Sequence, residues 1–167
     1  MITVSIAEKE NRISNLLKQM LLEKGISFSE GFPKAESEYL FLPLNEMKRR
    51  DVVLLDQPVS PPCAGECVTV LNADKRFSSW PHHSLLITYG LNPLSTVTAS
   101  SICTEEEETS FFCCLQRSIV TLKGNLLDPQ EFSVSVPAGE LDICEALGFV
   151  TPGLLFSVKP EEFKEVF

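Results

Sequence analysis

The opening of the chain most constrains its fold, because it sets an apolar strand directly before an amphipathic helix. Residues 1–6 form a run typical of a buried strand. Apolar residues then recur at helical spacing, namely Ile13, Leu16, Leu17, Met20 and Leu21. Gly25 follows as a helix terminator, and residues 26–29 alternate like a short strand. This order is the start of a βαβ unit and predicts an α/β fold.

The turn between the first strand and the helix lies where a phosphate-binding loop would lie. It reads Ala7-Glu8-Lys9-Glu10 and contains no glycine, no Gly-Lys pair and no Ser or Thr after it. A phosphate-binding loop needs glycines so that backbone N–H groups can approach the phosphates, and a lysine that adds positive charge. The opening therefore predicts an architecture more clearly than an activity.

The rest of the first half predicts more strands of an open, mostly parallel sheet. Apolar or alternating runs occur at residues 39–42, 51–55, 67–71 and 85–90. Short helical segments are expected at residues 44–50 and 74–80.

The second half changes to alternating stretches, which predict antiparallel strands. These stretches are residues 96–103, 109–116, 118–123 and 132–136. The acidic run at 105–108 is expected as a solvated hairpin loop, and Lys123-Gly124-Asn125 as a turn. A helix is predicted over residues 139–147 with Gly148 as its C-cap, and a last strand over 154–158. The predicted fold is a P-loop or Rossmann-like α/β sheet followed by an antiparallel hairpin extension.

Composition indicates one domain over residues 1–167 and limits the partners. Hydrophobic residues make up 44% of the chain and charged residues 22%, which supplies a core. The net charge of −9 argues against nucleic acid as a partner, since such binding needs clustered Lys and Arg. The chain shows no signal peptide and no apolar run near ~18 residues, so we expect a cytoplasmic protein without a membrane partner.

The six cysteines are expected to be reduced thiols, because a chain of this length does not need disulfides. Cys63 and Cys67 are spaced C-x3-C, but this spacing is poor for structural zinc, and the adjacent His82 and His83 do not readily face one ion. We therefore expect no metal. Three of the cysteines are expected as small core residues: Cys103, Cys113 and Cys144.

Two segments resemble the central ATPase domain of Mur ligases and their folylpolyglutamate synthetase relatives. Val68-Thr69-Val70-Leu71-Asn72-Ala73-Asp74 is similar to the strand and Asn-x-Asp segment of that domain. Leu86 to Pro93, followed by residues 97–102, is similar to its T-[FY]-G strand and the strand that leads into an antiparallel hairpin. The order and the spacing of the two segments match as well. The resemblance covers about residues 1–150 and excludes the flanking domains of the ligases.

The resemblance aligns the amino terminus with the family's phosphate-binding loop, V-T-G-T-N-G-K-T-T. Ile6 and Lys9 then stand for its two glycines, Glu10 for the phosphate-binding lysine and Asn11 for the magnesium-binding threonine. We expect Glu8 and Glu10 in the first helical turn, where a carboxylate gains about 0.3–1 kcal/mol from the helix dipole. The resemblance thus implies that the protein's own carboxylates take the role of the nucleotide.

Three further residues are singled out by the resemblance. Asp56 follows its strand where the family has an acidic metal ligand, but a strand-end or capping role is the stronger expectation. The family's Asn that corresponds to Asn72 lies near the adenine, which makes Asn72 and Asp74 candidate nucleotide-binding residues. The competing interpretation is that they cap the next short helix.

Two classes of function follow. The first is a non-catalytic Mur-ligase-like domain that binds a protein partner or forms a homodimer, with no cofactor. In one version of this hypothesis it works beside a ligase in cell-wall or amino-acid ligation. Its candidate surfaces are the segment around Phe32 and residues 80–83. The alternative is an enzyme or nucleotide-binding protein that uses a remodelled crevice at the carboxyl ends of the strands. Its nucleophile would be Cys63 or Cys67, with one of the two histidines as base.

Overall fold

The structure is a computed structural model of the chain that describes residues 1–44, 51–59, 66–78 and 84–165. The chain divides into two compact units, Met1–Ile87 and Thr88–Phe167. The prediction of one domain over residues 1–167 stays a prediction.

The first unit opens with the predicted strand and helix. Strand β1 (Ile2–Ala7) leads into helix α1 (Arg12–Glu23). The helix buries one apolar stripe, made of Ile13, Leu17, Met20 and Leu21. Gly25 follows it with a φ of 66°, a left-handed conformation that favours glycine, so the predicted helix end is confirmed.

The first unit contains a parallel sheet with β1 at its centre. Its other strands are β2 (Phe28–Glu30), β3 (Tyr39–Phe41), β4 (Val52–Leu55) and β5 (Cys67–Asn72). Strand β1 pairs with β3 on one side and β4 on the other, while β2 lies outside β3 and β5 outside β4. Because β3 lies between β1 and β2, the first βαβ unit joins strands that are not neighbours.

Two short helices predicted in this unit have different outcomes. The segment 44–50 lies outside the described residues except for Leu44. The described part of 74–80 contains no helix. It begins with a turn, in which the Lys75 N–H donates to the Asn72 carbonyl at 3.3 Å.

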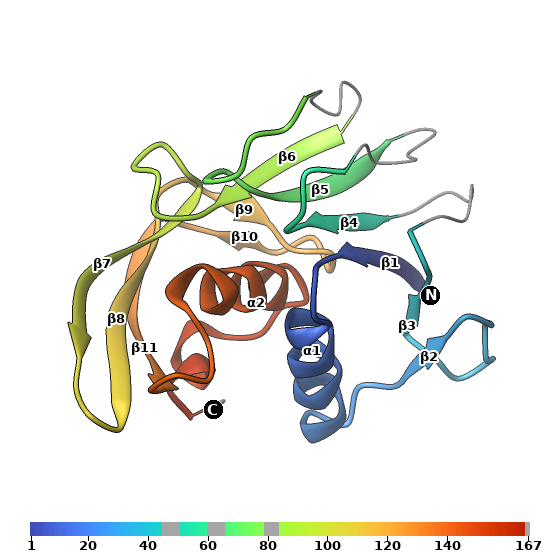
Figure 1. Cartoon of the computed structure of the whole chain (residues 1–167). Helices are drawn as coiled ribbons and strands as arrows, with labels where there is room; N and C mark the ends of the chain where they lie inside the picture. Colours follow the sequence, from blue (N-terminus) through green and yellow to red (C-terminus); the bar gives the residue numbers. More distant parts are fainter. Residues whose placement is uncertain (45–50, 60–65, 79–83, 166–167) are drawn as a thin grey trace. The chain divides into compact units, whose positions relative to one another are not determined.

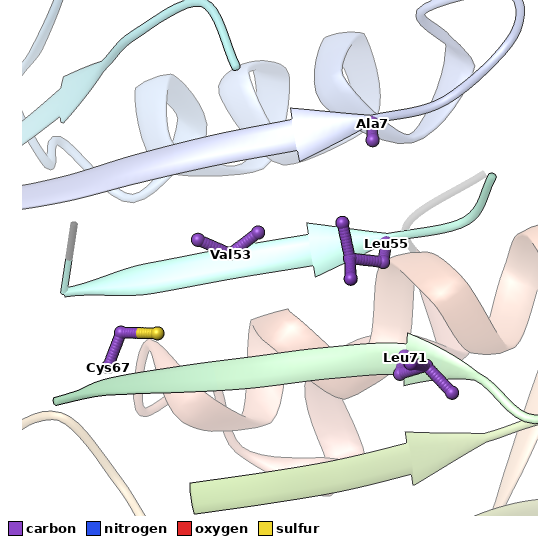
Figure 2. Packing of buried hydrophobic residues seen from close by; sticks show 5 residues of the cluster. All are labelled: Ala7, Val53, Leu55, Cys67 and Leu71. Carbon is purple, nitrogen blue, oxygen red and sulfur yellow. The ribbon is translucent and has the colours of Figure 1, made fainter. Parts of the chain in front are cut away.

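One apolar cluster of the first unit joins three neighbouring strands. It consists of Ala7 from β1, Val53 and Leu55 from β4, and Cys67 and Leu71 from β5 (Figure 2). Every residue of β4 is buried, as expected of an inner parallel strand that is covered on both faces. This cluster lies beneath the strand ends that carry the candidate site.

The second unit contains the predicted antiparallel extension. Strand β8 (Glu108–Leu115) lies between β7 (Val97–Thr104) and β11 (Gln130–Pro137) and is antiparallel to both (Figure 1). Strand β6 (Ser84–Tyr89) crosses the boundary of the units, and its last residue pairs in parallel with Val97. The sheet is therefore mostly parallel with an antiparallel part, which confirms the predicted fold class.

The loops of the second unit also follow the sequence. The acidic residues 105–107 are exposed in the hairpin between β7 and β8, and the Glu105 N–H donates to the Glu108 carbonyl at 2.8 Å. Gly124 has a φ of 84° in the turn between the two strands of a small hairpin, as predicted. These strands are β9 (Ile119–Val120) and β10 (Leu126–Leu127).

The helix and the strand predicted near the end of the chain have the wrong bounds or the wrong type. Helix α2 runs from Ile143 to Leu155, so Gly148 lies inside it, and the expected strand at 154–158 is the helix end and the turn after it. All residues of α2 from Ala146 onward are buried, and this packing outweighs the low helix propensity of Gly148, Pro152 and Gly153. A short 3-10 helix, η1 (Pro160–Glu165), follows and contacts β11.

Candidate functional site

Polar residues gather where three neighbouring strands end. Glu8 follows β1, Asp56 follows β4, and Asn72 is the last residue of β5. The Asp56 N–H donates to the carbonyl of Ala7 at 2.9 Å, which fixes the end of β4 beside the end of β1. Ligands of open α/β sheets bind at this carboxyl edge, so we treat it as the candidate site.

The Glu8 side chain occupies the amino terminus of α1. Its Oε2 accepts a hydrogen bond from the Ile13 N–H at 2.8 Å, and its Oε1 accepts one from the Ser14 N–H at 2.8 Å. The first N–H groups of a helix have no partner within the helix, and here the N-cap residue Asn11 makes no side-chain capping bond. A carboxylate thus lies where a helix binds an anion.

The expected placement of Glu8 and Glu10 needs a correction. The helix begins at Arg12, so both residues precede it rather than lying in its first turn. Of these two, Glu8 is the residue whose carboxylate accepts hydrogen bonds from N–H groups of the first helical turn. The Glu10 carboxylate instead forms an exposed ion pair with Arg12, with Nη2 and Oε2 2.8 Å apart.

The surroundings of Glu8 are unfavourable to a further negative charge. Burial raises the pKa of its carboxyl above the ordinary value of 4.5. The N–H groups of Ser14 and Ile13 act in the opposite direction, the charge of Asp56 raises this pKa further, and Lys18 lowers it. A phosphate that approached these N–H groups would have to displace Glu8 and would meet the field of Asp56.

Asp56 is the centre of a second polar cluster. Its Oδ1 accepts a hydrogen bond from Asn72 Nδ2 at 2.9 Å, and its Oδ2 lies 2.8 Å from Lys75 Nζ. The side chain of Gln57 donates to the same Oδ2 at 3.2 Å. Asp56 is buried, so this neutralising contact with lysine lowers the cost of its charge.

The predicted nucleotide-binding residues Asn72 and Asp74 are neighbours in this cluster. Asn72 is 1% exposed, and its Oδ1 accepts the Asp74 N–H at 3.1 Å while its Nδ2 binds Asp56. Both ends of the Asn72 amide are thus hydrogen-bonded, the Oδ1 within the turn after β5 and the Nδ2 to the residue that follows β4. Their assignment to a nucleotide stays a prediction.

Sequence reasoning missed Lys75, which supplies the cation of the cluster. The available signal was its place in the turn just after a buried strand that ends in Asn72. Asp56, in contrast, was singled out, and the structure gives it the role of a strand-end residue held by hydrogen bonds.

The cysteines differ in exposure, and the described residues hold no group of three metal-binding side chains. Cys113 is buried as predicted, and burial raises the pKa of its thiol. The prediction that Cys103 is a core residue is wrong, because it lies in the part of β7 that is exposed from Ser100 onward; Cys144 is half-buried. Cys67 is buried, while Cys63, His82 and His83 lie outside the described residues.

A cavity of about 200 Å³ lies beside α1 in the first unit. Phe41 and Leu42 contribute apolar lining at the end of β3, and Ser14 and Lys18 line it from the helix. Lys18 Nζ lies 3.0 Å from the Glu30 carboxylate and 5.4 Å from the centre of the Phe41 ring. The cavity therefore combines an apolar wall with one ion pair.

Comparison with known proteins shows which solved structures share this fold. No family model matches the chain, and no curated protein matches it. Among solved structures it is similar to MurF from Acinetobacter baumannii, with a TM-score of 0.62, 11% identity, and coverage of 98% of this chain and 45% of that one. It is also similar to a MurF ligase from Thermotoga maritima in complex with ADP, with a TM-score of 0.60, 11% identity, and coverage of 98% and 48%.

A murein peptide ligase from Psychrobacter arcticus gives a similar result, with a TM-score of 0.58, 10% identity, and coverage of 94% of this chain and 44% of that one. The chain thus spans less than half the length of the ligases that it matches. These likenesses confirm the resemblance to the Mur ligase central domain at the level of fold. No helix among the described residues has the length and apolar character to cross a membrane.

Proposed function

We propose that this chain is a non-catalytic domain with a Mur-ligase-like fold that acts through contact with another protein chain. The observation that carries the proposal is the Glu8 carboxylate on the N–H groups of Ile13 and Ser14. In this proposal the side chain permanently fills the position that a nucleotide phosphate would need. A role beside a ligase in cell-wall or amino-acid ligation belongs to the same proposal.

The electrostatics of the site support the same conclusion. Two carboxylates, Glu8 and Asp56, lie at the ends of adjacent strands, and the neighbouring cation Lys75 is already paired with Asp56. A triphosphate would bring several more negative charges to this edge. Binding it would require Glu8 to leave the helix and Lys75 to leave Asp56.

Thermal unfolding with and without millimolar Mg-ATP tests the proposal. A ligand at a hundred times its Kd adds about 2.7 kcal/mol to the stability of the folded state. We expect no change in the unfolding midpoint of the wild-type chain. A clear rise in the midpoint would overturn the proposal.

A second candidate function is a remodelled crevice that binds a small molecule, and the cavity beside α1 favours it. The cavity lies at the carboxyl ends of β1 and β3, where α/β sheets bind ligands. Stabilisation by Mg-ATP that Lys18→Ala abolishes, with Lys24→Ala as the control, would favour this candidate over the first.

A further inference from the structure

The outer edge of β11 carries backbone groups that make no hydrogen bond in the described part of the chain. The Ala138 N–H donates to the Glu107 carbonyl at 2.9 Å, directly across the register that joins β11 to β8. Hydrogen-bonded pairs alternate along an antiparallel ladder, so the even-numbered residues of β11 bond to β8. The N–H and C=O groups of Glu131, Ser133 and Ser135 therefore point away from β8.

Pro137 supports this assignment. It is odd-numbered, so its missing N–H would face outward and costs the ladder nothing. No described backbone group outside β11 bonds to Glu131, Ser133 or Ser135. A row of unpaired backbone groups of this kind is a template for pairing with another strand.

The edge also lacks several of the features that prevent such pairing. Proteins protect long edges with lysines, bulges or prolines. Strand β11 is eight residues long, pairs with β8 without a register shift, has Glu131 as its only charged residue, and has its proline at the last position. Helix η1 contacts β11 on its buried face, where the rings of Phe163 and Phe132 stack with centroids 5.9 Å apart, and the described backbone of η1 makes no hydrogen bond to the outward groups of the strand.

We propose that β11 pairs with β11 of a second copy of the chain, antiparallel and about a twofold axis at Ser133. The inference deepens the proposed function, since it rests on the idea that the domain acts through protein contact, and it names the partner as a second copy. In this register Ser133 faces Ser133 of the other copy, and Glu131 faces Ser135. Each outward N–H then meets an outward C=O, which is the isologous arrangement of a twofold dimer.

The side chains of β11 are self-complementary in the same register. Phe132, Val134 and Val136 are buried on one face, and the intervening side chains are polar and more exposed. Phe132 of one copy would face Val134 of the other, which continues the apolar face across the axis. The two Glu131 side chains lie apart, so no like charges are opposed.

Cysteine cross-linking tests the register. The two Ser133 positions form a hydrogen-bonded pair with Cα atoms about 5.5 Å apart, a distance that a disulfide spans. In a Cys114→Ser background, which removes a native thiol from that face, we expect Ser133→Cys to form a covalent dimer under mild oxidation. Ser135→Cys is the matched control, because its two copies would be about 13 Å apart along the strands. Equal cross-linking of both variants would overturn the proposal.

The mass in solution gives the second measurement. We expect light scattering to report twice the chain mass of 18.6 kDa for the wild type and a monomer for Ser133→Pro, which removes an outward N–H and no hydrogen bond to β8. A monomeric wild type, or a dimer that survives in Ser133→Pro, would overturn the proposal. A monomeric chain whose unfolding midpoint does not change with Mg-ATP would contradict the dimer but not the proposed function. A dimer that Mg-ATP stabilises would support the pairing of β11 but contradict the proposed function.

Discussion

Removing the Glu8 carboxylate should destabilise the chain through one identifiable set of contacts. In Glu8→Ala the N–H groups of Ile13 and Ser14 lose acceptors at 2.8 Å, and Asn11 offers no side-chain cap in their place. Replacing a capping side chain by alanine costs about 0.5–2 kcal/mol. For a chain of this size, each kcal/mol lowers the unfolding midpoint by about 2–4 °C.

Glu10→Ala is the matched control for this experiment. It removes the same charge two residues away, but it breaks only an exposed ion pair with Arg12, whose contribution is about 0–1 kcal/mol. Thermal unfolding followed by circular dichroism compares the two variants with the wild type. If Glu8→Ala unfolds no earlier than Glu10→Ala, the Glu8 carboxylate does not cap α1.

The pH dependence of the same difference tests the electrostatic part of the reasoning. The pKa of Glu8 is raised in the folded state, chiefly by burial, so the folded chain holds this proton more tightly than the unfolded chain. Its contribution to the free energy of unfolding is therefore fully present below the ordinary value of 4.5 and is lost as the pH rises through the folded pKa. Urea unfolding at several pH values should show the wild type exceeding Glu8→Ala by more in acid than at neutral pH. A difference that grows with pH would mean that the N–H bonds outweigh burial.

Four other predictions concern separate parts of the molecule. Asn72→Ala leaves the buried Asp56 carboxylate without one hydrogen bond, so urea unfolding should show a loss of about 1.5–3 kcal/mol; a loss near zero would contradict this role. Ser157→Gly should raise the unfolding free energy in calorimetry by up to about 1 kcal/mol, because Ser157 has a φ of 68° and its buried hydroxyl has no partner in the described residues; a decrease would refute this. Millimolar sulfate should stabilise Glu8→Ala more than the wild type in thermal unfolding, since the vacated N–H groups then bind an anion; equal effects would argue against an anion position. Added salt should strengthen the dimer in sedimentation experiments, because each copy carries a net charge of −9, and weakening by salt would contradict contact through uncharged strands.

The sequence predicted most strands because their patterns are local. The continuous apolar run at β4 and the alternation in β11 each report how many faces of a strand are buried. The order of the strands in the sheet was harder to predict. That β3 lies between β1 and β2 depends on contacts distant in sequence, which a local pattern does not contain.

Helix α2 shows where local signals fail. Gly148, Pro152 and Gly153 are helix breakers by propensity, and they led to a predicted helix end within what is a continuous buried helix. A signal for the true start was available, because Asp142 and Glu145 form a capping box with the D-x-x-E spacing. The true end has a Schellman motif with Ser157 in the position that glycine usually takes, so its sequence signature is weak.

The sequence predicted which kinds of side chain lie at the candidate site, but not which of them contact one another. The absence of glycine and of a Gly-Lys pair from residues 7–10, together with Glu8 and Glu10, pointed to carboxylates at the helix start, and Glu8 lies there. The selection of Glu8 over Glu10 depends on where α1 begins. The contact between Asp56 and Lys75 joins two loops, and only the parallel pairing of β4 with β5 brings them together.

The apolar core of this fold does not depend on a ligand at the candidate site, so the fold is stable without a bound nucleotide. The cluster of Ala7, Val53, Leu55, Cys67 and Leu71 is apolar and holds β1, β4 and β5 together without any ligand. At the ends of the same strands, Glu8 satisfies the helix N–H groups and Lys75 compensates Asp56, so the fold does not need a bound phosphate to meet these polar groups. A fold hosts different functions through the residues at such edges. Here the carboxyl edge of the sheet satisfies its own polar groups, whereas the outward backbone groups of β11 have no hydrogen-bond partner in the described part of the second unit.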